Sequence, residues 1–166
     1  LEKQLLGPDS PKALVLDLRN NPGGLFDEAV HLANLFLSSG MIVKAQGRNQ
    51  TILEVREATA KRTLSDPPLA ILMNESSASA AEILAGALQD HKRGQVFGST
   101  SYGKGSVQNI IDLSDGSGLK VTVAHYLTPS GKSIEGQGIK PDVVVQASQE
   151  RDNTLETSLR WLKSQL

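Results

Sequence analysis

Hydrophobic and polar residues recur along the chain with the periods of strands and helices. Short apolar runs at Ala13–Leu16 and Leu69–Met73 predict two buried strands. Between them, apolar residues over Phe26–Leu37 share one helical face, and Asp27 and Glu28 stand in what would be the first turn. The first part of the chain is therefore predicted to fold as strand, loop and helix.

The pattern changes to strand-like runs around two turn sequences, which predicts two hairpins. The strands flank GRNQ and SDGSG and are Met41–Gln46 with Thr51–Arg56, and Val107–Leu113 with Leu119–Leu127. A polar connection, EATAKRTLSDPP, follows the first hairpin.

Helical spacing returns after the strand Leu69–Met73, with a helix predicted from near Ser79 to about Asp90 and a short strand at Gln95–Phe97. A leucine stripe predicts a terminal helix, with Asn153 and Glu156 at capping-box spacing. Strand and helix units that repeat, with added hairpins, indicate an α/β fold.

Composition narrows the possible partners. The 166 residues suit one domain, and 17 Lys and Arg against 18 Asp and Glu give a net charge of -1, which offers no electrostatic footprint for nucleic acid or an anionic membrane. No cysteine is present, and no run is long enough to span a bilayer. Because residue 1 is leucine, we expect a piece of a longer protein, so the sequence leaves open whether the whole protein has a targeting segment.

The stretch GSTSYGKGS, residues 98–106, matches two chemical motifs in part. Gly98 to Lys104 fits a phosphate-binding G-x-x-x-x-G-K loop, but Gly105 replaces the Ser or Thr that binds Mg²⁺ and a strand follows instead of a helix. Ser101 and Lys104 form an S-x-x-K spacing, which needs one helical turn that the glycines disfavour. Without another partner, Lys104 is a solvated loop lysine.

Ser79 is the serine best placed for activation, because it stands where a buried strand's loop meets a helix. The N–H of Ala80 would then be a free donor of the first helical turn, suited to a developing oxyanion. An ordinary helix cap explains Ser79 equally simply, since Ser79 and Glu82 have capping-box spacing. Ser76 and Ser77 are rivals for either role.

The loop NNPGG could supply a second oxyanion donor, because Gly23 and Gly24 let a backbone N–H approach a carbonyl closely. A plain strand-to-helix turn is the alternative. The histidines His31, His91 and His125 lie in no catalytic motif, and the chain has no G-x-S-x-G sequence. A Ser-His-Asp hydrolase is therefore poorly supported.

Four segments taken together resemble the catalytic core of the carboxyl-terminal processing (tail-specific) peptidases. They lie in order within residues 13–145 and read LVLDLRNNPGG, NESSASAAEILAGALQD, SYGKGSVQ and TPSGKSIEGQGIKPDVVV. The resemblance implies an α/β, ClpP/crotonase-like core of strand-strand-helix units over residues 1–166. It implies a serine endopeptidase with no metal or cofactor.

By the same resemblance, each site residue receives a role. Ser79 would be the nucleophile, Lys104 the base 25 residues later, and Gln108 the support of Lys104; a strand period of two would place Lys104 and Gln108 on one face. The amide of Ala80 and one from Gly23 or Gly24 would form the oxyanion hole. Glu82 and Asp90 would support the site. Three positions depart from the family's usual residues without removing a catalytic group, namely Ser76, Ala81 and Ser101.

The resemblance also implies partners and a location. These are a protein or peptide substrate with an accessible C-terminus, a PDZ domain in the full-length protein, and an extracytoplasmic compartment such as periplasm, cell envelope or lumen. A non-catalytic peptide-binding homologue and a crotonase-like acyl-CoA enzyme are the alternatives; the acyl-CoA enzyme would have no use for a serine-lysine pair.

The dyad sets a condition on its lysine. An ordinary lysine, with a pKa of about 10.4, is protonated at neutral pH and cannot accept a proton. The hypothesis therefore expects Lys104 to be buried and without a carboxylate partner. A solvent-exposed Lys104 would mark a resting arrangement.

Overall fold

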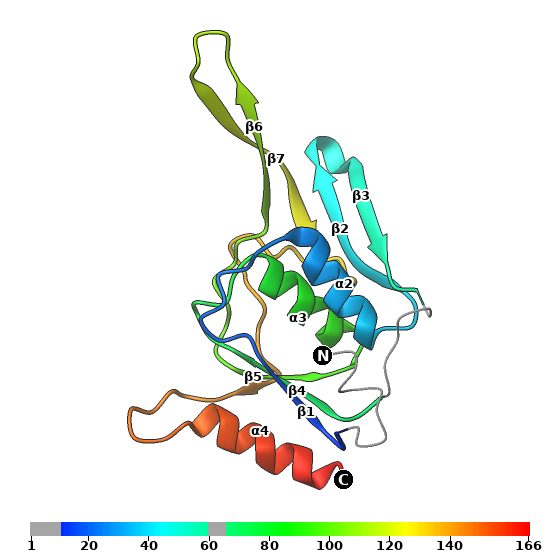
Figure 1. Ribbon diagram of the computed structural model, residues 1–166, viewed down its shortest axis with the longest axis vertical. Coiled ribbons are helices and arrows are strands. Elements are labelled where there is room, and N and C mark those ends of the chain that lie inside the picture. Colours follow the sequence, from blue (N-terminus) through cyan, green and yellow to red (C-terminus); the bar gives the residue numbers. More distant parts are fainter. Residues whose placement is uncertain (1–10, 60–65) are drawn as a thin grey trace.

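The computed structural model describes residues 11–59 and 66–166, and two four-stranded sheets organise them. The first sheet is parallel and has the order β1-β4-β5-β8 (Figure 1). Its strands are β1 (Leu14–Asp17), β4 (Leu69–Met73), β5 (Gln95–Gly98) and β8 (Val143–Val144). The strands predicted from the apolar runs and at Gln95–Phe97 are confirmed, while β8 was not predicted.

The second sheet is antiparallel, with the order β3-β2-β7-β6. Its strands are β2 (Met41–Gly47), β3 (Ile52–Glu57), β6 (Ser106–Asp112) and β7 (Gly118–Leu127), with a short 3-10 turn, η1 (Arg48–Gln50), between β2 and β3. Both predicted hairpins are confirmed. In the connection EATAKRTLSDPP, residues 60–65 lie outside the described part. The β6–β7 hairpin extends well beyond the rest of the chain (Figure 1).

The described residues form three α-helices, α2 (Phe26–Phe36), α3 (Ala80–Asp90) and α4 (Asn153–Ser164). Each confirms a helix predicted from the sequence. The predicted cap of α4 is wrong by one residue: Asp152 is the N-cap and accepts the Leu155 N–H at 3.0 Å, while Asn153 is the first helical residue. No described helix has the length and apolar character needed to cross a membrane.

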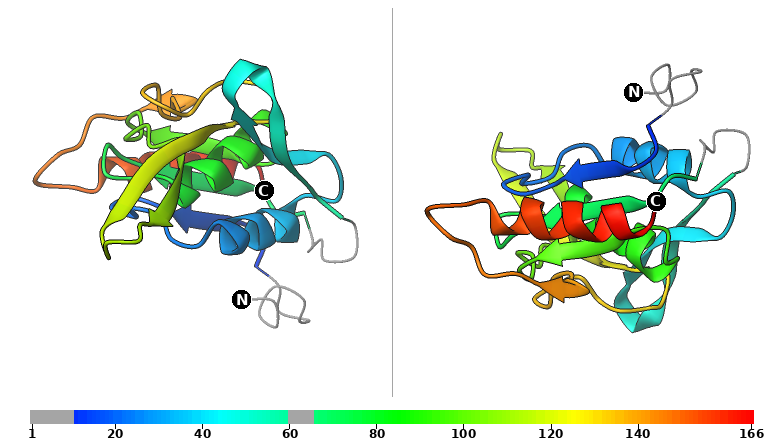
Figure 2. Two further views of the ribbon diagram at one scale, coloured as in Figure 1. Left: turned by 90° about the horizontal axis from the view of Figure 1, so that it is seen from above. Right: turned by 90° about the horizontal axis from the view of Figure 1, so that it is seen from below.

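Strand β4 is buried on both faces, which explains its unbroken apolar sequence. Leu69, Ile71 and Met73 join the core formed with α2 and α3, whereas Ala70 and Leu72 join a second core formed with α4. Helices therefore cover both faces of the parallel sheet, with α4 alone on one side (Figure 2). The mixed α/β fold predicted from the sequence is confirmed.

Candidate active site

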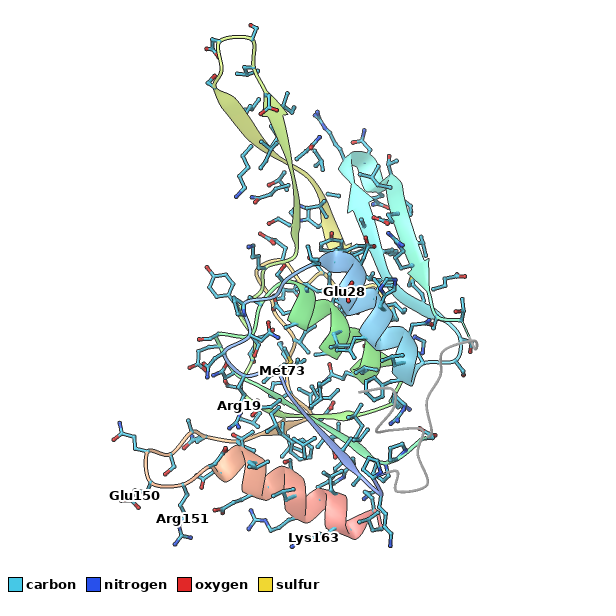
Figure 3. The ribbon with its side chains drawn as sticks, in the orientation of Figure 1. Arg19, Glu28, Met73, Glu150, Arg151 and Lys163 are labelled. Atoms are coloured by element: carbon cyan, nitrogen blue, oxygen red, sulfur yellow. The ribbon has the colours of Figure 1, made fainter. Side chains whose placement is uncertain are left out.

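Three loops meet at the carboxyl edge of the parallel sheet, where neighbouring parallel strands end together. They follow β1 (residues 18–25), β4 (residues 74–79) and β5 (residues 99–105). Figure 3 marks this edge with Arg19 and Met73. The middle loop is bonded to both neighbours: Ala78 N–H donates to Asn21 O at 2.9 Å, and Tyr102 N–H donates to Ser77 O at 2.9 Å. The three loops therefore hold one another in place.

Ser79 lies in the middle loop, directly before α3, in an unusual backbone conformation. Its φ is 57° and its ψ is -119°, a combination that non-glycine residues rarely adopt and that costs about 1–3 kcal/mol. Ser79 and Glu82 form a capping box, in which the Glu82 N–H faces the Ser79 side chain and also donates to the Ser79 carbonyl oxygen at 2.9 Å. The other half of the capping box is formed, with Ser79 N–H donating to Glu82 Oε2 at 2.7 Å. The capping box therefore fixes the backbone of Ser79 at the start of α3.

Glu82 is fully buried, with 0% of its surface exposed, and its carboxylate connects the loops after β4 and β5. Oε2 accepts the N–H groups of Ser79 (2.7 Å) and Lys104 (2.9 Å). Oε1 accepts the hydroxyl of Ser101 (2.5 Å) and the N–H of Gly103 (2.7 Å). Four donors thus replace the water that a buried carboxylate loses. This arrangement brings the backbones of the two proposed dyad residues together at a single oxygen atom.

Ser101 is buried and its hydroxyl is engaged in two hydrogen bonds, which agrees with its exclusion as a nucleophile. Its hydroxyl donates to Glu82 and accepts the Ile139 N–H at 2.6 Å. The sequence analysis did not foresee this bridging role. A hydroxyl three residues before Lys104 carries no signal that separates a bridge to a distant acid from a surface serine.

Lys104 differs from the sequence-based expectation, because its side chain is exposed rather than buried. The backbone next to Lys104 is closely packed, because an added Cβ on the following residue, Gly105, would lie 2.5 Å from Glu135 N. Within residues 11–59 and 66–166, no carboxylate forms an ion pair with the Lys104 ammonium. The expected freedom from a carboxylate holds for the described residues, and the expected burial does not.

Gln108 is exposed on β6, opposite Thr122 of β7. Lys104 precedes β6, which begins at Ser106, so the strand period that was expected to align Lys104 with Gln108 does not extend to Lys104. The role of Gln108 remains a prediction.

The NNPGG loop lies against Ser79, as the sequence analysis required. Gly23 has a φ of 102°, and a Cβ added to it would stand 2.8 Å from the Ser79 Cβ and 3.0 Å from the Ala80 nitrogen. Gly23 N–H already donates to Asn21 Oδ1 at 2.9 Å. Among the described residues, neither Gly24 N–H nor Ala80 N–H has a hydrogen-bond partner. These two amides are therefore the available donors beside Ser79.

A cavity of about 170 Å³ opens beside the same two amides. It lies between α2 and α3, with Gly24 and Ala80 on its wall and Ala29, Leu32 and Leu84 among its apolar lining. Figure 3 shows Glu28, another lining residue, on α2. The cavity has the size and polarity to receive a small apolar side chain next to a carbonyl held by the amides.

Asp90 lies at the opposite end of α3 from Ser79, about 16 Å away along an 11-residue helix. Partial burial alone would raise its pKa, but hydrogen bonds from Thr128 and Ser130 hold the pKa of Asp90 below its ordinary value. Asp90 thus fastens the turn at residues 128–130, and the structure does not bring it to Ser79 or Lys104.

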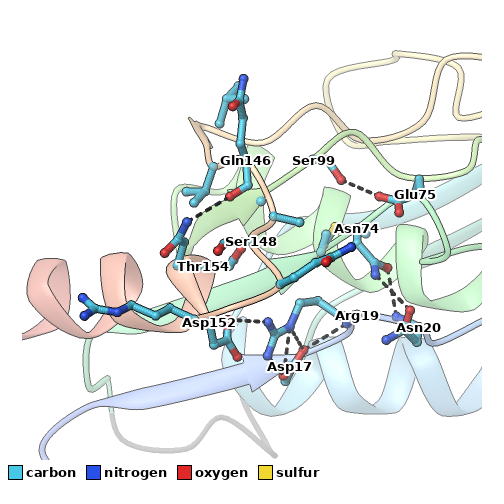
Figure 4. Close-up of a pocket in the computed structure, with 18 of the residues that line it drawn as sticks. Asp17, Arg19, Asn20, Asn74, Glu75, Ser99, Gln146, Ser148, Asp152 and Thr154 are labelled. Atoms are coloured by element: carbon cyan, nitrogen blue, oxygen red, sulfur yellow. Dashed lines mark hydrogen bonds and ion pairs between the residues drawn. The ribbon is translucent and has the colours of Figure 1, made fainter.

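The carboxyl edge also carries a polar cluster that the sequence analysis missed (Figure 4). Arg19 donates to Asp17 through Nη2 at 2.6 Å and to Asp152 through Nη1 at 2.7 Å, which ties the start of α4 to the loop after β1. Asn20 and Asn74 exchange two hydrogen bonds of 2.9 Å across the first two loops. Polar residues directly after β1, in the sequence DLRNN, were the available signal.

The histidines stay outside the site. His31 is exposed on α2 near Glu28, His125 is exposed on β7, and His91 caps the end of α3 with Nε2 2.7 Å from Met41 O. The described residues contain no group of three or more His, Asp or Glu side chains arranged to hold a metal ion. A serine with a lysine remains the pairing that the loops bring together.

Comparison with known proteins gives consistent matches. The family model described as peptidase family S41 matches residues 3–145. The carboxy-terminal-processing protease of Bartonella bacilliformis is 49% identical over 138 residues, which are 83% of this chain and 32% of that protein. A probable CtpA-like serine protease of Staphylococcus aureus is 47% identical over 138 residues, which are 82% of this chain and 28% of that protein. The chain thus spans about a third of the length of these relatives.

Solved structures match in the same way. The photosystem II D1 C-terminal processing protease superposes with a TM-score of 0.79 and 43% identity, covering 91% of this chain and 39% of that one. The tricorn protease, at 17% identity and a TM-score of 0.59, covers 93% of this chain and 15% of that one and shares the fold.

Proposed function

The chain belongs to peptidase family S41, and from this premise we propose that it hydrolyses peptide bonds in proteins with Ser79 as nucleophile and Lys104 as base. The observation that carries the proposal is the shared acceptor: both residues donate their backbone N–H to Glu82 Oε2. A loop serine and a loop lysine 25 positions apart need such a link to act as one unit.

The reaction begins when Ser79 Oγ attacks the substrate carbonyl carbon while Lys104 Nζ accepts the hydroxyl proton. The carbonyl oxygen becomes an oxyanion, which accepts hydrogen bonds from the N–H groups of Ala80 and Gly24 at the positive end of α3. Lys104 then gives the proton to the leaving amine as the peptide bond breaks. Water then attacks the acyl-enzyme carbonyl carbon while Lys104 accepts a proton from it. Lys104 returns this proton to Ser79 Oγ as the ester bond breaks, which releases the carboxylic acid product and restores Ser79.

We assign the second oxyanion donor to Gly24 rather than Gly23. Both glycines line the cavity, but Gly23 N–H is already engaged by Asn21, whereas Gly24 N–H has no partner among the described residues. The role of Gly23 is then steric, since only a residue without a Cβ fits so close to Ser79. The cavity would hold the side chain that precedes the cleaved bond.

The exposed Lys104 corresponds to a resting arrangement. A lysine serves as a base only when neutral, and exclusion of water favours the neutral form of an amine. A polypeptide lying over Lys104 would exclude that water, and no carboxylate among the described residues would compete for the ammonium. Substrate binding would therefore complete the dyad.

The substrate we propose is a protein with an accessible C-terminus, cleaved near that end. The relatives named above as carboxy-terminal-processing proteases support this substrate class. An extracytoplasmic location in periplasm, cell envelope or lumen is part of the same proposal. We further infer that residues 1–166 form a single catalytic core and that a PDZ domain of the full-length protein delivers the substrate's end. Gln108 would steady Lys104.

Covalent labelling tests the nucleophile directly. We expect a serine-directed phosphonate to modify the full chain at Ser79, as located by peptide mass spectrometry, and to react more slowly with Lys104→Ala. Labelling of Ser76, Ser77 or Ser101 in place of Ser79 would contradict the assignment.

A further inference from the structure

Strand β6 forms an open edge of the antiparallel sheet. In the sheet order β3-β2-β7-β6, β6 pairs with β7 on one side, and within the described residues nothing pairs with its other side. The hairpin projects away from the rest of the molecule (Figure 1), and residues 108–112 of β6 are exposed while Ser106 and Val107 are partly buried. An open edge presents a row of main-chain groups to any extended polypeptide.

Hydrogen bonds at the two ends of β6 show which of its main-chain groups face β7 and which face outward. At its base, Gly105 O accepts Tyr126 N–H at 2.7 Å; at its tip, Leu113 N–H donates to Ser117 O at 2.8 Å. Main-chain groups alternate along an antiparallel strand, so odd-numbered residues face β7 and even-numbered residues face outward. The outward-facing residues of β6 are Ser106, Gln108, Ile110 and Asp112.

The two edges of the sheet differ in how they resist unwanted pairing. On β3, Arg56 forms ion pairs with Glu54 and Asp27, and charged groups of this kind discourage added strands. Between Ser106 and Asp112, β6 has the sequence VQNII, without charge or proline, and Ile110 is 69% exposed. The β6 edge thus lacks the usual protection and has the composition of a strand that pairs.

We propose that the β6 edge binds the protein substrate as an added β-strand, an inference that rests on the protease function proposed above. The reason for choosing the substrate is continuity: β6 begins two residues after Lys104, whose N–H shares its acceptor with Ser79. A strand added to β6 leads from the hairpin across Lys104 to the nucleophile. Its main chain supplies most of the binding, so recognition extends to many sequences.

The length of β6 sets the reach of the site. Its seven residues span about 23 Å, so about six or seven substrate residues on one side of the cleaved bond can pair with it. The same strand covers Lys104 and removes it from water, which couples binding to the readiness of the base. A second copy of the chain is the competing occupant that the test separates.

A matched pair of proline variants tests the edge. Ile110 and Lys120 face each other across the hairpin, and since Ile110 directs its main chain outward, Lys120 does so on the opposite edge. Proline at either position removes an outward N–H and leaves the β6–β7 ladder intact. Ile110→Pro therefore damages the proposed edge, and Lys120→Pro controls for proline in the same hairpin.

Each full-length variant is assayed with a ten-residue peptide and with a small ester that reaches Ser79 without contacting β6. We expect the ratio of peptide to ester kcat/KM to fall about tenfold in Ile110→Pro, through KM, and to keep its wild-type value in Lys120→Pro. An unchanged ratio in Ile110→Pro, an equal fall in both, or a fall in Lys120→Pro alone would overturn the proposal. An Ile110→Pro variant that changes only the oligomeric state in light scattering would also overturn it, in favour of a second copy.

A second measurement uses the unmodified protein and remains informative if Ile110→Pro does not fold. Substrate amides are replaced by esters one at a time, and we expect KM to rise at every second position; a uniform response would refute strand addition. Wild-type protein that cleaves neither ester nor peptide would instead refute the protease function, so the two failures are distinguishable.

Discussion

Ser79 and Lys104 donate their backbone N–H groups to the same oxygen atom, Glu82 Oε2, at 2.7 and 2.9 Å. The buried carboxylate therefore sets the spacing of the two loops that carry the proposed nucleophile and base. Because the contact is made through backbone atoms, it leaves both functional side chains free for chemistry.

Replacing Glu82 tests this link. Glu82→Gln keeps the size but exchanges one acceptor oxygen for an NH₂ group that faces N–H donors, leaving two buried donors unpaired at about 1–3 kcal/mol each. We expect the free energy of unfolding to fall by about 2–6 kcal/mol and kcat to fall at least about 100-fold. Urea denaturation and peptide cleavage measure the two effects. Glu156→Gln, at an exposed position of α4, is the control, and equal behaviour of the two variants would refute the role of Glu82.

Replacement by alanine should destabilise the protein at Gly23 but not at the adjacent Gly24. In Gly23→Ala, the new Cβ meets Ala78 O and the Ser79 Cβ at 2.8 Å and the backbone needs a φ of 102°, so we expect loss of labelling at Ser79 and a lower melting temperature. In Gly24→Ala, the new Cβ meets nothing within 4 Å, so thermal unfolding should match the wild type. Comparable melting temperatures for both variants would contradict this close approach of Gly23 to Ser79.

Filling the cavity should narrow the choice of substrate. Ala29 lines the cavity between α2 and α3, and Ala29→Leu adds three carbon atoms to a space of about 170 Å³. We expect kcat/KM to fall about tenfold or more for peptides with leucine before the cleaved bond, and less for peptides with alanine there. A parallel fall for both peptides would show that this cavity does not receive that side chain.

The attachment of α4 should weaken in acid. Hydrogen bonds from Arg19 lower the pKa values of Asp17 and Asp152 below their ordinary value of 3.8. A lowered pKa in the folded protein stabilises it above the ordinary value, and this contribution disappears as the pH falls through the folded-state pKa. Unfolding midpoints in urea should therefore drop between about pH 5 and pH 2, with a smaller drop in Asp152→Asn. An identical pH dependence in that variant would exclude the Arg19–Asp152 contact as a cause.

Local sequence patterns predicted most of the fold because each element carries its own signal. The unbroken apolar run of β4 and the stripe of α3 are set by burial within the element itself. The N-cap of α4 shows where local patterns stop being sufficient. Asp152 and Asn153 are both residue types that cap helices well, and Asp152, the actual N-cap, also contacts the distant Arg19. Strand β8 has two residues, too few for a period.

The candidate site was predictable only in part for the same reason. Ser79 and the glycines were found from their place between strand and helix, and Lys104 from the resemblance to a family. The four bonds of Glu82 join residues up to 22 positions apart, and no local pattern encodes such long-range contacts. The exposure of Lys104 depends on what covers it in three dimensions, which its flanking glycines do not reveal.

Digestion of an unstructured protein by the full chain tests the central claim most directly. We predict that Ser79→Ala and Lys104→Ala each reduce the cleavage rate at least about 1,000-fold, while Lys163→Ala, at an exposed position of α4, cleaves at the wild-type rate. Cleavage at the wild-type rate by either Ser79→Ala or Lys104→Ala would contradict the serine-lysine dyad.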